Sequence, residues 1–406
     1  MRALLFSNLF PTSVDPNRGL FTRQLAVELA RLCELEVAVP LPWFPSGRLA
    51  ARLAPGYARE FGQLADRLEF DGLLATYPRY PLIPKLSERA HDRLMYLGVR
   101  GAITRRHRER PFDVINAHWL YPDGVVATQI GARLKLPVVL TGLGCDVNDD
   151  LQIPAKRSRI LEAAHAAAAV TTVSQPLADA LREAGVPDDR ITVIPNGVDT
   201  MRFSLGDRAA ARRTLGLDQN PLVVCVSRLS HEKGVDVLIE AARTLAATSP
   251  AVQIAVIGEG PERPALTARI AAAGLGERVR LVGAVPHAAV AVWMTAADVV
   301  VMASRREGHP NAAMEALACG RPLVASHVGA LCQLVTEQRG ITVPPDDAPA
   351  LATTLATALT RSWDYAAIAA SVRDESWTRA AAAYFHVLER AANSRLPDSA
   401  RRVIAA

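Results

Sequence analysis

The sequence predicts an α/β protein made of two Rossmann-like domains that face each other across a cleft. The chain has 406 residues, which is more than one ordinary hydrophobic core requires. Short apolar runs alternate with longer Ala-rich helical runs, as in parallel sheets covered by helices on both faces. The strand-like runs also form two groups, separated by the loop-forming residues Pro195, Asn196 and Gly197.

We expect each domain to contain five strands that lie between helices. In the first domain these are "RALLFSN", "ELEVAVP", "DVINAHW", "PVVLTG" and "AVTTVS". In the second they are "LVVCVSR", "QIAVIG", "VRLVG", "DVVVMAS" and "PLVAS". The predicted parts are an N-terminal domain over 1–196, a C-terminal domain over 197–376, a helix over 377–393 and a tail over 394–406.

The composition is that of a packed globular protein from a reducing compartment. Half of the residues are apolar and 21% are charged. The five cysteines are scattered and form no C-x-x-C pair, which argues against a zinc or disulfide framework. No secretory signal and no long apolar run is visible in the sequence, so we expect a cytoplasmic protein.

Positive charge is concentrated between residues 45 and 110, where 13 Arg and Lys stand against 7 Asp and Glu. The same region and the residues just before it also carry aromatic side chains, at Trp43, Phe44, Tyr57, Phe61, Tyr77, Tyr80 and Tyr96. Basic and aromatic residues together suit an anionic membrane surface on the inner face of the cytoplasmic membrane. A solvated basic face over core aromatics explains the pattern equally well. No nucleic-acid-binding motif accompanies the charge, so no nucleic-acid partner is expected.

A phosphate site is predicted in the loop of "VVCVSRLSHEKGVDVLIEA". Arg228 and Lys233 lie between a strand and the start of a helix, where backbone amides and the helix dipole attract anions. Only four of the 46 basic residues are lysines, which favours a specific need for the compact charge of Lys233. Two solvent-facing loop cations are the alternative.

Two carboxylates surround the turn in "SRREGHPNAAMEALACG". Glu307 lies in the loop after a strand, and Glu315 lies in the second turn of the following helix. Between them are the residues whose amides open that helix, namely Gly308, His309, Pro310 and Asn311. Carboxylates suit hydroxyl-rich groups and amides suit phosphate, so this segment could bind a sugar nucleotide along its length. An acid that merely complements the helix dipole is the alternative.

Three further loops follow strands of the first domain. His118 in "NAHWLYPDG" comes directly after the strand "DVINA" and could donate a hydrogen bond to a substrate, although a lone histidine is more often structural. Thr141 and Asp146 lie in "LTGLGCDVN" and are expected to be exposed to the cleft, as contacts for acceptor or sugar. Gly19 precedes a helix and would let the backbone approach a diphosphate.

Several other classes of site lack support. The segment "IGEGPERP" places Arg263 where the third glycine of G-x-G-x-x-G belongs, which argues against a dinucleotide. No P-loop, G-x-S-x-G, H-E-x-x-H or D-x-D motif is present. We therefore expect no cofactor and no metal.

Six motifs together resemble the retaining glycosyltransferases of family 4, which have the GT-B fold. They are "SRREGHPNAAMEALACG", "SRLSHEKG", "IGEGPE", "VSQPLADAL", "VIPNGVD" and "AHWLYPDG", and they span nearly the whole chain. The opening "SNLFPTSVDPNRGLF" and "AHWLYPDG" look most like the branch for teichuronic-acid and cell-surface polysaccharide synthesis.

The resemblance assigns a role to each candidate residue. Arg228 and Lys233 would hold the donor diphosphate, Glu307 the transferred sugar and Glu315 the ribose. The other implied contacts are Gly19 to the diphosphate, His118 beside the donor sugar, and Gly283 and Val285 to the base. His309 departs from the family, whose members often carry an apolar residue there. The C-terminal helix would cross back onto the first domain.

The implied activity is metal-independent transfer of a sugar with retention of configuration. The donor would be a nucleotide sugar, with UDP favoured over GDP, and the acceptor a lipid-linked glycan or polysaccharide. A sugar-nucleotide epimerase of the same architecture and a non-catalytic sugar-nucleotide binding protein are the alternatives.

Overall fold

The computed structural model describes residues 1–43, 65–82, 87 and 90–394. The chain divides into two compact units. Unit 1 contains residues 1–196 and 377–406, and unit 2 contains residues 197–376. The chain therefore leaves unit 1 once and returns to it, at the positions that the sequence predicts.

Unit 1 is built on a mainly parallel sheet with the strand order β10-β9-β8-β7-β1-β2-β5-β4. Its strands are β1 (Arg2–Phe6), β2 (Glu34–Ala38), β4 (Arg67–Phe70), β5 (Leu73–Thr76), β7 (Val114–His118), β8 (Val138–Gly142), β9 (Ala169–Thr172) and β10 (Ile191–Val193). A separate pair joins β3 (Leu41–Trp43) to β6 (Arg79–Pro81). The helices are α1 (Leu20–Leu29), α4 (His91–Glu109), α5 (Val125–Leu134), α6 (Cys145–Asn148), α7 (Pro154–Ala166), α8 (Gln175–Glu183) and α17 (Trp377–Asn393).

Unit 2 is built on a parallel sheet with the order β13-β12-β11-β14-β15-β16. Its strands are β11 (Leu222–Val226), β12 (Gln253–Ile257), β13 (Val279–Gly283), β14 (Val299–Met302), β15 (Leu323–Ser326) and β16 (Gly340–Val343). The helices are α9 (Arg208–Leu215), α10 (Val235–Thr248), α11 (Arg263–Ala272), α12 (His287–Ala296), α13 (Asn311–Ala318), α14 (Leu331–Leu334), α15 (Ala348–Thr360) and α16 (Tyr365–Ala370). Strands alternate with helices as in a Rossmann-like domain, which confirms the predicted fold class.

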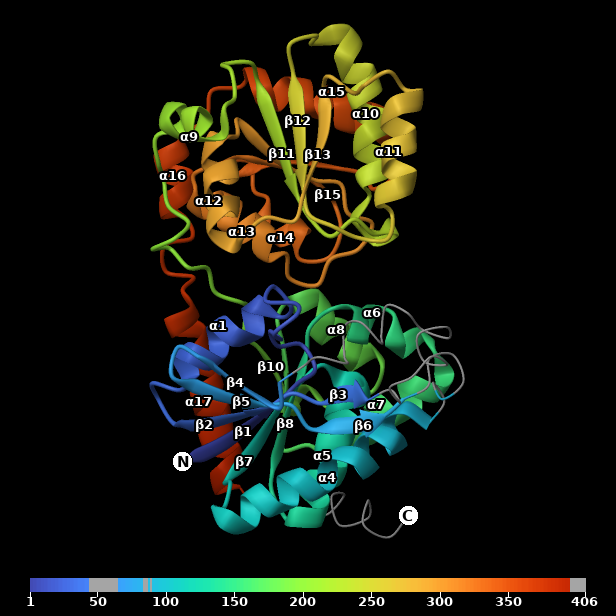
Figure 1. The fold of residues 1–406 in the computed structure, drawn as a ribbon, viewed down its shortest axis with the longest axis vertical. Helices are drawn as coiled ribbons and strands as arrows, with labels where there is room; N and C mark the ends of the chain where they lie inside the picture. Colours follow the sequence, from blue (N-terminus) through green and yellow to red (C-terminus); the bar gives the residue numbers. More distant parts are fainter. Residues whose placement is uncertain (44–64, 83–86, 88–89, 395–406) are drawn as a thin grey trace. The chain divides into compact units, whose positions relative to one another are not determined.

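The C-terminal helix α17 packs on unit 1, as expected. Figure 1 shows this helix in red beside the blue strands β1 and β2 and the helix α1. The predicted apolar face is buried, with Trp377, Tyr384, Val387 and Leu388 each at most 6% exposed. These side chains form one core cluster with residues of α1, β1, β7 and β8.

The edge of the unit 1 sheet differs from the all-parallel expectation, because β4 pairs with β5 in antiparallel orientation. Asp71 and Gly72 connect the two strands and both have positive φ, at 51° and 79°. An Asp-Gly pair in this conformation forms the tight turn of a hairpin. The same dipeptide in the sequence signals this hairpin, which the predicted strand set lacks.

The structure also corrects the interpretation of the basic region. Tyr77 and Tyr80 are only 2% and 3% exposed, so these aromatics belong to the core of unit 1 and not to an interface. Trp43 is 52% exposed. Phe44, Tyr57 and Phe61 lie outside the described residues.

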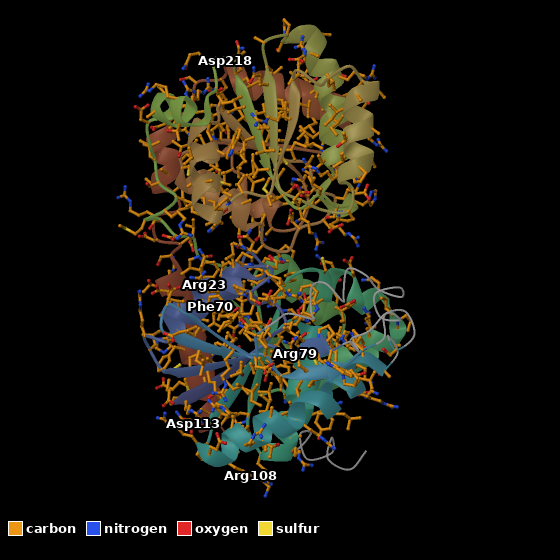
Figure 2. All side chains as sticks on the ribbon, viewed as in Figure 1. Arg23, Phe70, Arg79, Arg108, Asp113 and Asp218 are labelled. Atoms are coloured by element: carbon orange, nitrogen blue, oxygen red, sulfur yellow. The ribbon has the colours of Figure 1, made fainter. Side chains whose placement is uncertain are left out.

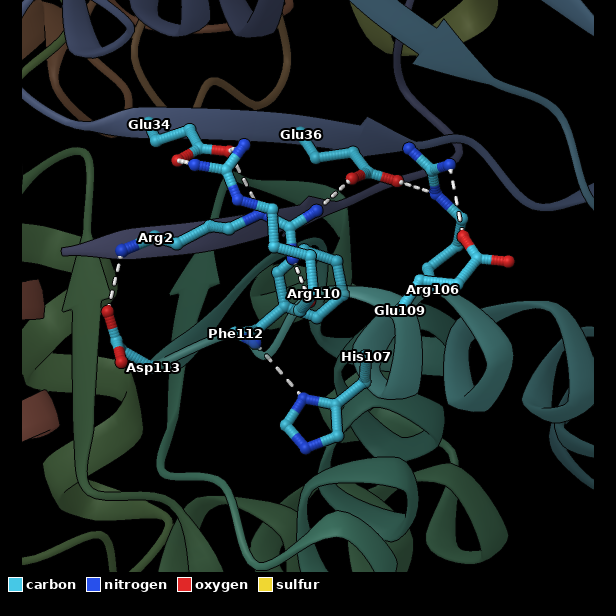
Figure 3. A network of polar contacts seen from close by, with 9 residues as sticks. All are labelled: Arg2, Glu34, Glu36, Arg106, His107, Glu109, Arg110, Phe112 and Asp113. Atoms are coloured by element: carbon cyan, nitrogen blue, oxygen red, sulfur yellow. Dashed lines mark hydrogen bonds and ion pairs between the residues drawn. The ribbon is translucent and has the colours of Figure 1, made fainter.

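Part of the basic charge stabilises the amino ends of the unit 1 strands (Figure 3). Arg2, the first residue of β1, donates to Glu36 of β2 over 2.6 Å, and Arg106 of α4 donates to the same carboxylate over 2.6 Å. Arg110 pairs with Glu34 in the same network. These contacts attach α4 to the sheet at the end opposite the strand carboxyl ends, where ligands of such folds bind. Arg106 and Arg110 therefore have a structural role.

Candidate functional site

Apart from Gly19 and His118, which belong to unit 1, the predicted donor residues lie in unit 2, at or just after the carboxyl ends of its strands. The loop after β11 carries Arg228 and a short 3-10 turn at His231–Lys233, and α10 begins next. Gly234 between them has φ 63°, and a Cβ there would lie 1.9 Å from the carbonyl oxygen of Ala303. Ala303 belongs to the loop that follows β14, and only glycine fits so close to it. Strands β11 and β14 are neighbours in the sheet, so the loops that follow them lie side by side. The two loops are thereby brought into contact.

This contact joins Lys233 to Glu307. Lys233 Nζ donates to Glu307 Oε1 over 2.7 Å, and the Ser304 hydroxyl donates to the same oxygen over 2.7 Å. The Glu307 side chain is 5% exposed and that of Lys233 is 24% exposed. A buried carboxylate requires such partners to stay charged. The pair therefore fixes one acidic group and one basic group directly beside the start of α13.

Arg228 is held differently, on the exposed side of the same loop. It donates to Glu232 over 2.6 Å, and its side chain is 66% exposed. Burial alone would raise the pKa of the Glu232 carboxyl, but hydrogen bonds from Ser230 and Arg228 outweigh it and lower the pKa to about 2. Glu232 is thus a charged partner that holds Arg228 and leaves it accessible to an anion.

Arg305 locks these loops together and is a residue that the sequence analysis missed. Its guanidinium donates twice to Asp236, over 2.9 Å each, and once to the His231 carbonyl over 2.6 Å. Its backbone N–H donates to the carbonyl of Glu232 over 2.8 Å. A bidentate arginine fixes direction as well as distance. Arg305 therefore sets the separation between the loop of Lys233 and the loop of Glu307.

The turn before α13 has the expected form. Pro310 caps the helix, which begins at Asn311 and ends before Gly320, a residue with φ 74°. The first N–H groups of a helix have no partner within it, so those around Gly308 and Asn311 are suited to an anion. Burial lowers the pKa of His309 to about 4, against an opposing hydrogen bond to Asn311. His309 is therefore neutral at physiological pH.

Glu315 has a partner that the sequence analysis did not identify. His287, the first residue of α12, contacts Glu315 with 2.7 Å between Nε2 and Oε1. Gly283, with φ 94°, is the last residue of β13, and the half-buried Val285 lies between it and this histidine. The predicted ribose and base residues therefore adjoin one another in unit 2.

Unit 1 places His118 in a row of side chains across three strands. His118 on β7 lies opposite Thr141 on β8, and Thr141 lies opposite Thr171 on β9. Tyr384 of α17 covers this row, with its ring centroid 5.6 Å from that of His118. Both ring nitrogens of His118 are buried and form no hydrogen bond with a described residue. Burial lowers its pKa to about 3, so the imidazole is neutral.

The expected exposure of Thr141 and Asp146 is wrong, because both are fully buried within unit 1. The Thr141 hydroxyl lies 2.8 Å from that of Thr171. Asp146 accepts from the backbone N–H groups of Leu120, Leu143 and Gly144 over 2.7–3.2 Å. A short acceptor beside a tight loop satisfies backbone donors, so Asp146 stabilises the loops after β7 and β8.

The local packing is a sufficient reason for a glycine at position 19. It precedes α1 with φ 56°, and a Cβ would lie 2.2 Å from the carbonyl oxygen of Leu9. Its predicted contact with a diphosphate remains a prediction. Metal independence also remains a prediction. In the described part of the chain, no group of three or more His, Cys, Asp or Glu is suited to a metal ion. Across those same residues, no helix has the length and apolarity needed to cross a membrane.

Comparison with known proteins gives matches along most of the chain. Residues 20–202 match the family described as Glycosyltransferase Family 4, and residues 220–361 match Glycosyl transferases group 1. A glycosyltransferase named for teichuronic acid biosynthesis, TuaC of Bacillus subtilis, is 28% identical over 87% of each chain. The 2-deoxystreptamine glucosyltransferase of Streptomyces kanamyceticus is 30% identical over 66% of this chain and 74% of its own.

Solved structures show the same architecture. Sucrose-phosphate synthase of Thermosynechococcus elongatus superposes with a TM-score of 0.74 at 22% identity, over 96% of this chain and 98% of that one. HepE of Anabaena, in complex with UDP and glucose, superposes with a TM-score of 0.71 at 21% identity, over 96% and 99%. The matches set aside the epimerase and the non-catalytic binding protein as alternatives. This chain belongs to the glycosyltransferases, with a family 4 domain followed by a group 1 domain in the GT-B fold, and it is an enzyme of that class.

Proposed function

We propose that this enzyme transfers a sugar from a nucleotide sugar to a lipid-linked glycan or polysaccharide at the cytoplasmic face of the membrane, with retention of configuration and without a metal. The observation that carries the proposal is the Lys233–Glu307 pair, held at 2.7 Å beside the start of α13. It sets a cation for phosphate next to a carboxylate for sugar hydroxyls. The complex of HepE with UDP and glucose favours a UDP sugar as donor, with a GDP sugar as the alternative.

Each residue then has a defined task. Lys233, Arg228 and the backbone N–H groups of Gly308, His309 and Asn311 stabilise the charge that develops on the departing diphosphate. Loss of one such donor typically lowers turnover by about 10²–10³. Glu307 accepts hydrogen bonds from the hydroxyls of the transferred sugar, and Glu315 accepts those of the ribose. Gly19 keeps its proposed role at the diphosphate, and Gly283 and Val285 keep theirs at the base. The proposed role of His118 at the donor sugar requires access to its ring, which Tyr384 covers in unit 1.

Thermal unfolding with UDP, GDP or ADP tests the donor class. We expect one nucleotide to stabilise the wild type, by about 2.7 kcal/mol at a concentration 100-fold above its dissociation constant. Glu315→Ala should lose this stabilisation. Absence of a shift with all three nucleotides would refute the nucleotide-sugar proposal.

The course of the reaction is tested separately. NMR of the first-formed product should show the anomeric configuration of the donor, and an inverted product would refute retention. Activity should persist in excess chelator. Loss of activity that Mg²⁺ or Mn²⁺ restores would refute metal independence.

For the membrane, we propose the exposed face of α4. Arg100, Arg105 and Arg108 line a shallow groove of about 710 Å³ together with Arg133 of α5 and one acid, Glu109. None of the four arginines forms an ion pair with a described residue, and Arg108 lies at the outer end of α4 (Figure 2). Leu97, one turn before Arg100, is 54% exposed. Cations without an ion-pair partner, on a helix that also exposes a leucine, suit anionic lipid headgroups over an apolar layer.

Flotation with liposomes tests this face. We expect binding to vesicles of phosphatidylglycerol and phosphatidylcholine but not to phosphatidylcholine alone, with weakening as salt rises. Replacing the four groove arginines by Gln should abolish it. The matched control replaces four exposed arginines of unit 2, namely Arg213, Arg269, Arg280 and Arg373. Equal loss in both variants would show that net charge alone acts, and would refute the α4 face.

A further inference from the structure

Three side chains of unit 2 form a chain of contacts that ends on Glu315. Arg202 Nη1 lies 2.9 Å from Nδ1 of His287, and His287 Nε2 lies 2.7 Å from Glu315 Oε1. The Phe203 ring packs against the imidazole, with 5.0 Å between ring centroids. The His287 side chain is 16% exposed and that of Glu315 is 13% exposed. The imidazole is therefore held on both nitrogens and on one face.

The contacts determine the tautomer of His287. A guanidinium can only donate hydrogen bonds, so Nδ1 must accept from Arg202. The ring proton of the neutral imidazole then lies on Nε2, which donates to the Glu315 carboxylate. Both hydrogen bonds involve a charged group and run in one direction, from Arg202 through His287 to Glu315.

As a consequence, one oxygen of the Glu315 carboxylate is hydrogen-bonded within the protein and the other is available to a ligand. Oε1 of Glu315 accepts from His287, and Oε2 forms no hydrogen bond with any described residue. An unsupported glutamate has three rotatable bonds and would have to be ordered when a ligand binds. With His287 in place, the remaining acceptor positions have a fixed direction before the ligand arrives.

We infer that His287 is a positioning residue that orients Glu315 for the two ribose hydroxyls of the donor nucleotide, and so sets the preference for ribose over deoxyribose. This inference rests on the proposed ribose role of Glu315. A residue that merely tied α12 to α13 would affect binding of both nucleotides equally. The preference itself therefore separates positioning from simple stabilisation of the fold.

The test compares UDP with 2′-deoxy-UDP by isothermal titration calorimetry, or GDP with 2′-deoxy-GDP if GDP is the nucleotide that stabilises the protein. We expect the wild type to prefer the ribonucleotide by about tenfold or more, since a buried acceptor would lose its donor. His287→Ala should reduce this ratio at least threefold. His287→Gln should largely retain it, because the amide can accept from Arg202 and donate to Glu315.

A double-mutant cycle combines His287→Ala with Glu315→Ala. Glu315→Ala should abolish the preference, and His287→Ala should then have no further effect on the ratio in the Glu315→Ala background. Loss of the preference in Glu315→Ala with the wild-type ratio in His287→Ala would overturn the role of His287 alone. An unchanged ratio in Glu315→Ala would overturn both this inference and the proposed ribose role.

Discussion

The carboxyl ends of the two sheets carry opposite kinds of polar group. In unit 2, the candidate residues are charged and paired, with Arg228 on Glu232 and Lys233 on Glu307. In unit 1, the row of His118, Thr141 and Thr171 is neutral and lies buried under Tyr384. The same architecture thus holds fixed charges in one unit and a buried neutral row in the other.

The difference has a physical cause in what covers each strand end. In unit 1 the helix α17, which begins 259 residues after His118, covers the face that His118 occupies. Burial then penalises the charged imidazole and lowers its pKa to about 3. In unit 2 the loops after β11 and β14 keep one partner of each pair in contact with water. Unit 2 therefore holds fixed charges at its strand ends, while the corresponding row in unit 1 stays neutral.

The largest effect is expected from breaking the more buried of the two unit 2 pairs, Lys233–Glu307. Lys233→Ala leaves the Glu307 carboxylate buried without its cation, which typically costs about 3–5 kcal/mol. The free energy of unfolding, measured in urea, should fall by this order of magnitude. The double variant Lys233→Ala with Glu307→Gln should recover most of the loss.

Arg228→Ala is the matched control in the same loop. Its pair with Glu232 is largely exposed, so its loss should cost less than about 1 kcal/mol. If both single variants lost the same stability, burial would not distinguish the two pairs, and the comparison between them would be wrong.

Much of this arrangement could be predicted from sequence, because it depends on local patterns. All ten expected runs contain a strand, and the apolar face through Trp377 and Tyr384 is buried as its spacing indicates. The position of Glu307 after β14 and of Glu315 in α13 follows from the Gly-His-Pro-Asn turn. The periodicity of apolar residues and the Gly, Pro and Asn residues at element ends are enough to predict such strands and helices.

Pairing across the fold could not be predicted in the same way. Arg305 binds Asp236, 69 residues earlier, and His287 binds Glu315, 28 residues later. Their residue types are ordinary for surface loops, so no local signal separates them from solvated charges. The burial of Thr141 was missed for the same reason, since it depends on a helix that begins at Trp377.

A second, smaller effect should appear in the pH dependence of stability. The pKa of His118 is lowered to about 3 in the folded protein, below the ordinary value near 6.5. At His118 the unfolded chain therefore binds more protons than the folded chain between these values, so the contribution of this group to stability falls as pH falls below about 6.5. For one such group the slope approaches about 1.4 kcal/mol per pH unit.

His118→Leu should flatten this slope by up to that amount between pH 6 and pH 4, measured by urea unfolding at each pH. His309, whose pKa is lowered to about 4, leaves part of the slope in place. His165→Leu, at an exposed position of unit 1, is the matched control for replacing a histidine by leucine. An unaltered slope in His118→Leu would contradict a buried, neutral His118.

The smallest effect is expected from removing the hydroxyl of Tyr384, which forms hydrogen bonds with Thr141 and Thr171. Burial raises the pKa of Tyr384 to about 12, against opposing hydrogen bonds with the hydroxyls of Thr171 and Thr141. Tyr384→Phe keeps the ring over His118 and removes only these bonds, so unfolding should become easier by about 1 kcal/mol. Thr171→Val should cost a similar amount alone and little more when combined with Tyr384→Phe, because both changes remove the same interaction. Fully additive losses would instead show that the hydroxyls act independently, and that α17 covers His118 by ring packing alone.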